Sequence, residues 1–162
     1  MTATRTFRLL PFVAVAALSV TAFFSAPETA DAHCQVPCGI YDDNVRFVLM
    51  KEHAATIAKA ATQITELAGK TDGQSAQQLA RWVANKESHA QEIQQISLDY
   101  FLAQRLKPGA AGDDAADKKY RDQLAAVHQV IVLSMKCKQN ADPALAVELT
   151  KAIEAFQKAY GA

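Results

Sequence analysis

The sequence DDNVRFVLMKEHAATIAKAATQITELAG, at residues 42–69, predicts an amphipathic helix. Asp42 or Asp43 can cap its N-terminus, the helix runs to about Leu67, and Gly69 ends it. Apolar residues recur along it at intervals of three, four and seven, at Val45, Val48, Leu49, Ile57, Ile64 and Leu67. This spacing places them on a common side, which we expect to face a core.

Three further segments have the same character and are joined by short loops. They are a helix capped by Ser75 that ends before Pro108, one over about 114–138, and one capped by Asp142 with Pro143 at its first position that ends at about Tyr160. Apolar residues recur at helical spacing at Leu79, Trp82, Val83, Ile93, Ile96, Tyr100 and Phe101, and again at Tyr120, Leu124, Val127, Ile131 and Met135. The fold class is therefore predicted to be all-α, an antiparallel up-and-down four-helix bundle over residues 42–162.

The composition narrows the classes of function. The 162 residues are 50% hydrophobic, which is enough for one domain with a core. Seventeen basic residues balance seventeen acidic ones, so bulk charge gives no reason to expect a nucleic acid partner. The helices lack the Glu-x-x-His pairs of di-iron bundles, and His53, His89 and His128 stand singly. Any chemistry must therefore come from the N-terminal segment.

Residues 1–32 have the pattern of a cleaved secretory leader. Arg5 and Arg8 precede an apolar run that ends at Phe24 and is shorter than the ~20 residues of a spanning helix. Small residues spaced as at a cleavage site end at Ala32. We expect a maturation protease to cut there and leave no stable membrane partner. The product is expected to be exported to the periplasm or outside the cell; cytoplasmic processing and a retained anchor are the alternatives.

The next residues, His33-Cys-Gln-Val-Pro-Cys38, carry metal donors. A free His33 offers its α-amine and imidazole, Cys34 offers its amide nitrogen and a thiolate, and Cys38 offers a second thiolate. Pro37 and Gly39 are turn residues that allow Cys38 to return to the same plane. A planar set of two nitrogens and two sulfurs selects Ni(II) or Cu(II) over zinc.

The segment His33-Cys-Gln-Val-Pro-Cys-Gly-Ile-Tyr41 closely resembles the hook H-C-x-x-P-C-G-x-Y of nickel-containing superoxide dismutases. The resemblance implies one nickel ion per subunit, held by His33, Cys34 and Cys38. It implies conversion of superoxide to dioxygen and hydrogen peroxide by Ni(II)/Ni(III) cycling. Tyr41 would then lie over the open face of the metal, and Pro37 would shape the hook. A homohexamer is also implied, with a domain over 33–162 that consists of a hook (33–41) and a bundle (42–162).

The sequence departs from the best-known members of this family around the ligands. Those members carry an aspartate after the first cysteine, where this chain has Gln35. They orient the axial imidazole with a glutamate in the first helix and an arginine in the second. An approximate alignment places Val48 or Leu49 and His89 at these positions, and Glu52 is one turn further along. Glu52 and His89 are therefore candidate partners of the axial imidazole.

Other functions fit the same residues. Cys34 and Cys38 could form a disulfide in an exported bundle that holds no metal. The hook could also belong to a nickel or copper binding or carrier protein without turnover, although Tyr41 as an access gate favours catalysis. Cys137, near the end of the third helix, is interpreted as a partly buried free thiol and is not assigned to nickel.

Overall fold

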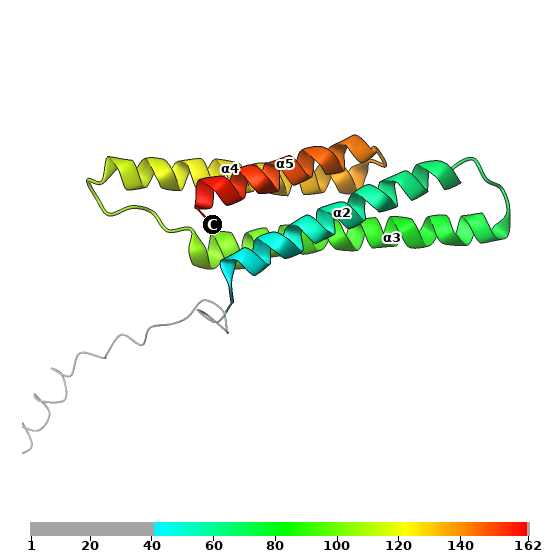
Figure 1. Ribbon diagram of the computed structural model, residues 1–162, viewed down its shortest axis with the longest axis horizontal. Coiled ribbons are helices and arrows are strands. Elements are labelled where there is room, and N and C mark those ends of the chain that lie inside the picture. Colours follow the sequence, from blue (N-terminus) through cyan, green and yellow to red (C-terminus); the bar gives the residue numbers. More distant parts are fainter. Residues whose placement is uncertain (1–40, 162) are drawn as a thin grey trace, which may run out of the picture. The chain divides into compact units, whose positions relative to one another are not determined.

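The computed structural model describes residues 41–161, which form four long helices and contain no strand (Figure 1). Helix α2 spans Asp43–Leu67, α3 spans Gly73–Gln95, α4 spans Asp114–Gln139 and α5 spans Pro143–Tyr160. A π-helical segment, η1 at Ile96–Arg105, continues α3. The predicted all-α four-helix bundle is confirmed.

The predicted leader and most of the predicted hook lie outside the described residues. This applies to His33, Cys34, Pro37, Cys38 and Gly39, so their assigned roles stay predictions. Tyr41 is the one hook residue that the structure describes.

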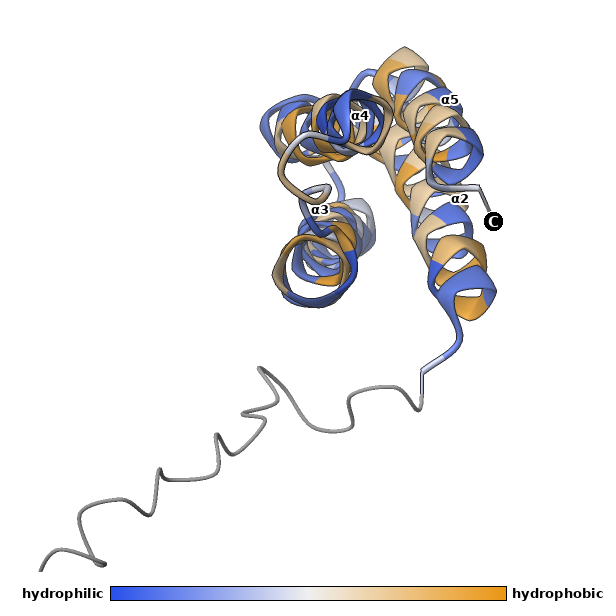
Figure 2. Ribbon diagram, turned by 90° about the vertical axis from the view of Figure 1, so that its left-hand side faces the viewer, coloured by the Kyte–Doolittle hydropathy of each residue, from blue (hydrophilic) through white to orange (hydrophobic). Residues whose placement is uncertain are grey.

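Consecutive helices lie side by side, and the last helix closes on the first. Helix α2 packs against α3 and α5, and α4 packs against α3 and α5 (Figure 1). Each helix carries hydrophobic and hydrophilic stretches around its circumference (Figure 2). None of the helices within residues 41–161 is both long enough and apolar enough to cross a bilayer.

An aspartate caps the N-terminus of each helix. The side chains of Asp42, Asp72, Asp113 and Asp142 accept hydrogen bonds from backbone N–H groups in the first turns of α2, α3, α4 and α5. Each such cap stabilises a helix by about 0.5–2 kcal/mol. The prediction that Ser75 caps the second helix is wrong. Ser75 lies inside the first turn, where its backbone N–H donates to Asp72 Oδ1 at 2.9 Å and its hydroxyl to Asp72 Oδ2 at 2.6 Å.

The core face of α2 differs from the predicted one. The buried residues are Phe47, Met50, Ala54, Ile57, Ala60, Ala61 and Ile64. Ile57 and Ile64 were predicted correctly, whereas Val45 and Val48 are 46% and 49% exposed. Two apolar stripes with the same spacing run along this helix, and the one with the larger side chains of Phe47 and Met50 faces inward. Val83 and Met135, also placed among the apolar positions, are exposed as well.

The π-helical segment η1 changes which residues share a face. The N–H of Leu106 donates to the carbonyl of Phe101, five residues earlier, at 2.9 Å. Residues five positions apart therefore lie on the same side of this segment, as Tyr100 and Arg105 do. The adjacent residues Tyr100 and Phe101 are both buried. Phe101 packs against Phe47 and Phe156 with ring centroids 4.8 Å apart in each pair.

Candidate functional site

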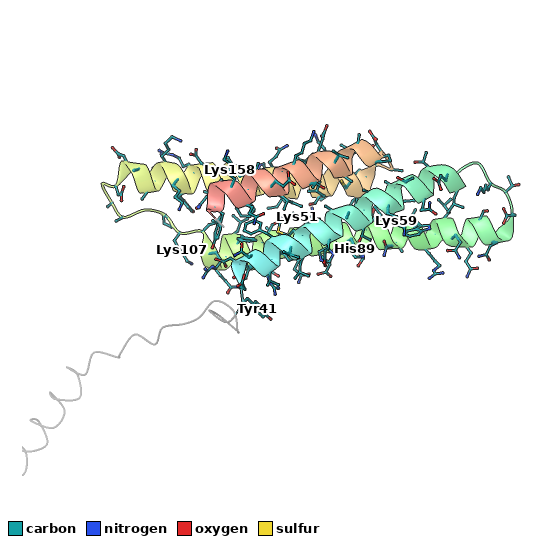
Figure 3. The ribbon with its side chains drawn as sticks, viewed as in Figure 1. Tyr41, Lys51, Lys59, His89, Lys107 and Lys158 are labelled. Atoms are coloured by element: carbon teal, nitrogen blue, oxygen red, sulfur yellow. The ribbon has the colours of Figure 1, made fainter. Side chains whose placement is uncertain are left out.

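Tyr41, the predicted gate residue, lies at the start of α2 on the outside of the bundle (Figure 3). Its side chain is 47% exposed. The guanidinium carbon of Arg46 lies 4.5 Å from the centroid of the Tyr41 ring, a cation–π contact. The hydroxyl of Tyr100 shares its one proton between Asp43 Oδ1 and the backbone carbonyl oxygen of Tyr41, which lies 3.0 Å away. The ring is therefore open to solvent while its backbone is tied to the bundle.

Asp43 connects this segment to two other elements. Its Oδ2 accepts hydrogen bonds from Arg105 at 2.6 Å and from the Tyr160 hydroxyl at 2.7 Å. Its Oδ1 accepts from the Tyr100 hydroxyl. Arg105 Nε also donates to the Tyr160 hydroxyl at 3.2 Å. The carboxylate thus joins the first turn of α2 to η1 and to the last residue of α5.

The network shifts the pKa values of its members. Burial alone would raise the pKa of Asp43, but hydrogen bonds from Arg105, Tyr100 and Tyr160 outweigh it and lower the pKa below its usual value. Burial and the hydrogen bond to Asp43 raise the pKa of Tyr100 to about 12. The same two causes raise the pKa of Tyr160. At neutral pH the cluster is therefore a carboxylate held by two neutral phenols and a guanidinium.

A pocket of about 250 Å³ lies beside Tyr41. Its lining comes from α2, α3 and η1, with Tyr41, Arg46, Gln95, Ile96, Asp99, Tyr100 and Gln104. The Nε of Arg46 is buried and has no hydrogen-bond partner within the described residues. The guanidinium of Arg46 also lies over the Tyr41 ring, so the pocket carries a positive charge, an arrangement that favours a small anion.

His53 and His89, which the sequence analysis treated as single histidines, form a pair. His53 on α2 and His89 on α3 approach with their Nδ1 atoms 2.7 Å apart, and both rings are half-buried. Burial lowers the pKa of His53, with repulsion from His89 as the second cause. Figure 3 shows His89 midway along the bundle, away from Tyr41. Glu52, the other predicted partner of the axial imidazole, is exposed on α2.

Other ionisable groups lie away from this region. Cys137 is 2% exposed, so the prediction of a partly buried thiol understated its burial, and burial raises the pKa of the thiol to about 11. His128 is exposed on α4. Within residues 41–161 no three His, Cys, Asp or Glu side chains converge into a metal-binding group.

Sequence reasoning missed Arg46, Tyr100, Arg105 and Tyr160, and it treated Asp43 only as a possible cap. One signal was available in the sequence. Two aspartates stand where one cap is needed, which leaves the second carboxylate for another partner. The other members come from η1 and α5, and only the packing of helices brings them to Asp43.

The comparison with known proteins agrees with the resemblance seen in the hook. A family model described as nickel-containing superoxide dismutase matches residues 28–162, which is most of the chain. No curated protein and no solved structure matches this chain.

Proposed function

The chain belongs to the family of nickel-containing superoxide dismutases, and from this premise we propose that His33, Cys34 and Cys38 hold its nickel in an N-terminal hook. The enzyme is a nickel-dependent oxidoreductase whose substrate is superoxide. The proposal adds which residues bind the metal and how the bundle supports them.

The donor set fits nickel. The amine of His33, the amide nitrogen of Cys34 and the thiolates of Cys34 and Cys38 provide two nitrogens and two sulfurs in sequence order. Such a set would suit Ni(II), and the imidazole of His33 would add a further nitrogen donor. Bound there, nickel supplies the one-electron Ni(II)/Ni(III) couple that dismutation of superoxide requires.

The observation that carries this placement is the anchoring of Tyr41. Tyr41 is three positions after Cys38, so their Cα atoms are at most about 11 Å apart. The Tyr41 carbonyl is held by Tyr100, and the next turn is held through Asp43. A hook that ends at this fixed point would keep the phenol of Tyr41 near the metal, where we assign it to ordering water and restricting access to small anions.

Arg46 would act on the substrate before it reaches the metal. Superoxide is a small anion, and the guanidinium of Arg46 lies over the exposed Tyr41 ring beside the 250 Å³ pocket. Local positive charge raises the encounter rate of an anionic substrate. We assign Arg46 to this attraction.

The imidazole of His33 would need a partner that fixes its orientation as a ligand. We keep His89 and Glu52 as the candidates. The Nδ1 of His89 is engaged by His53, so His89 would use its Nε2 for this role. The exposed carboxylate of Glu52 is the second option.

Maturation and assembly form the rest of the proposal. Cleavage after Ala32 would release the α-amine of His33, in an exported protein or, alternatively, in the cytoplasm. A homohexamer would bury apolar residues that the single subunit leaves exposed, such as Val45, Val48 and Leu98.

The test compares a chain that begins at His33 with the same chain extended by one glycine. Both are loaded with nickel, and dismutation is measured against metal content. We expect activity in proportion to nickel only for the first, with loss in Cys34→Ser and in Cys38→Ser. Cys137→Ser is the matched control and keeps activity, because this thiol lies in the bundle core.

Two results would contradict the proposal. Bound nickel without turnover would favour a carrier or metal-binding protein. A metal-free chain with a Cys34–Cys38 disulfide would favour the structural alternative.

A further inference from the structure

We propose that His53 and His89 form a second metal site, distinct from the hook, for a late first-row divalent cation of the Cu(II) and Ni(II) class. The two imidazoles come from different helices, α2 and α3, and converge through the same ring atom. Their ring centroids are 4.9 Å apart and their planes meet at 54°.

The separation of the two nitrogens suits neighbouring positions on one metal. Two ligand nitrogens at about 2.0–2.1 Å from a metal lie about 2.8–3.0 Å apart at a right angle and about 3.3–3.4 Å apart in a tetrahedron. The Nδ1 atoms here are 2.7 Å apart, close to the right-angled value. Tetragonal nitrogen sites favour Cu(II) or Ni(II), whereas zinc prefers the wider tetrahedral spacing.

Two carboxylates surround the pair with negative charge. Glu92 stands one turn after His89 on α3, and Glu52 is next to His53 on α2. Both act electrostatically on the His53 ring and favour positive charge there. Both are exposed, so they can offset part of the charge of a bound cation without first being desolvated.

We expect the metal ion at this site to exchange readily with ions in solution. Because no third ligating side chain joins the two imidazoles among residues 41–161, water would fill the remaining positions. The site uses Nδ1 of His89, so it is compatible with the role assigned above to the Nε2 of that ring. Without metal, the two rings share a hydrogen bond between α2 and α3.

The experiment uses the full chain with Cys34→Ser and Cys38→Ser, so that hook thiolates do not compete. Cu(II) is titrated by equilibrium dialysis, and the bound ion is examined by pulsed electron paramagnetic resonance, which counts coordinated imidazoles. Parallel titrations use His53→Gln and His89→Gln. The control is His128→Gln, which removes an exposed imidazole on α4.

The site predicts one equivalent of Cu(II) with two imidazole ligands, and a tenfold or greater loss of affinity in each of the two variants. The His128→Gln chain should bind within twofold of the parent. Affinity within twofold of the parent in either His53→Gln or His89→Gln overturns the proposal, since a two-ligand site needs both. If circular dichroism shows that a glutamine variant does not fold, the asparagine variant at that position takes its place.

Discussion

The ammonium nitrogen of Lys86 lies 2.7 Å from the carbonyl oxygen of Lys138, across the contact between α3 and α4. It also donates to the carbonyl of Cys137 and pairs with Glu87 at 3.3 Å. The carbonyls in the last turn of a helix have no partner within that helix. Lys86, which belongs to α3 and is 3% exposed, therefore supplies the missing hydrogen-bond donors to the C-terminus of α4.

Replacing Lys86 by methionine should destabilise the bundle. The change keeps the apolar stem but leaves the two carbonyls without their charged donor, a loss of about 1–3 kcal/mol in the free energy of unfolding. Urea unfolding measures it. Lys59→Met, at an exposed position of α2, is the matched control and should stay within about 0.5 kcal/mol of the parent. Equal values for the two variants would contradict the assigned role of Lys86.

Asp43→Asn should also destabilise the bundle, because the amide cannot replace a carboxylate that accepts from Tyr100, Arg105 and Tyr160. Hydrogen bonds to a charged group contribute about 1.5–3 kcal/mol, and we expect a loss of that order in urea unfolding. The control is Asp114→Asn, an exposed aspartate in the first turn of α4. A loss no larger than that of the control would show that the network is dispensable.

The pKa of Asp43 gives a direction for the pH dependence. Its pKa is lowered in the folded state from the usual value of 3.8, so the unfolded chain binds this proton more readily. The stabilisation is fully present above about pH 4 and is lost as pH falls through the folded-state pKa. The difference in unfolding free energy between the parent and Asp43→Asn should therefore shrink as the pH falls below about 4. A difference that stays constant over this range would contradict the assignment.

Arg46→Gln should slow the enzyme at low substrate concentration. Removing the positive charge beside Tyr41 should lower kcat/KM for superoxide by about threefold to tenfold and weaken its dependence on salt. Nickel content should not change. Arg81→Gln makes the same charge change in the first half of α3 and serves as the control. If both variants lose activity equally, net charge rather than the position of Arg46 is responsible.

Cys137 should be inert in the folded protein. Its side chain is buried in the core and its pKa is raised to about 11, so little thiolate forms at pH 8 and reagents cannot reach it. In the Cys34→Ser and Cys38→Ser background, iodoacetamide should modify it at least a hundredfold more slowly in buffer than in urea. Comparable rates would mean that the end of α4 opens readily.

Much of the fold was predictable because it depends on local signals. Asp42 and the Asp142-Pro143 pair correctly marked two helix starts, and the apolar spacing gave the number of helices. The buried face of α2 was not predictable from spacing, since Val45 and Phe47 belong to stripes of equal period. Which of the two stripes is buried depends on how α2 is rotated about its axis relative to its neighbours.

The candidate site, too, was predictable only where it depends on residues close together in the sequence. The donor residues of the hook were proposed from nine consecutive residues and stay a prediction, because they lie outside residues 41–161. The pairing of His53 with His89 joins residues 36 apart and requires the α2–α3 packing to be known. Tyr100 and Arg105 lie on the same side of η1 because of the π-helical turn, which no residue in that stretch predicts.

The hydrogen bond from Tyr160 to Asp43 joins residues 117 positions apart, at the two ends of the bundle sequence. During translation, α2 leaves the ribosome long before Tyr160 has been added to the chain. Any chain that stops short of α5 would carry the complete hook sequence without the phenol that helps to hold its attachment point. This contact therefore forms only once α5 has been made, so that a product terminated before α5 lacks part of the support for its metal-binding segment.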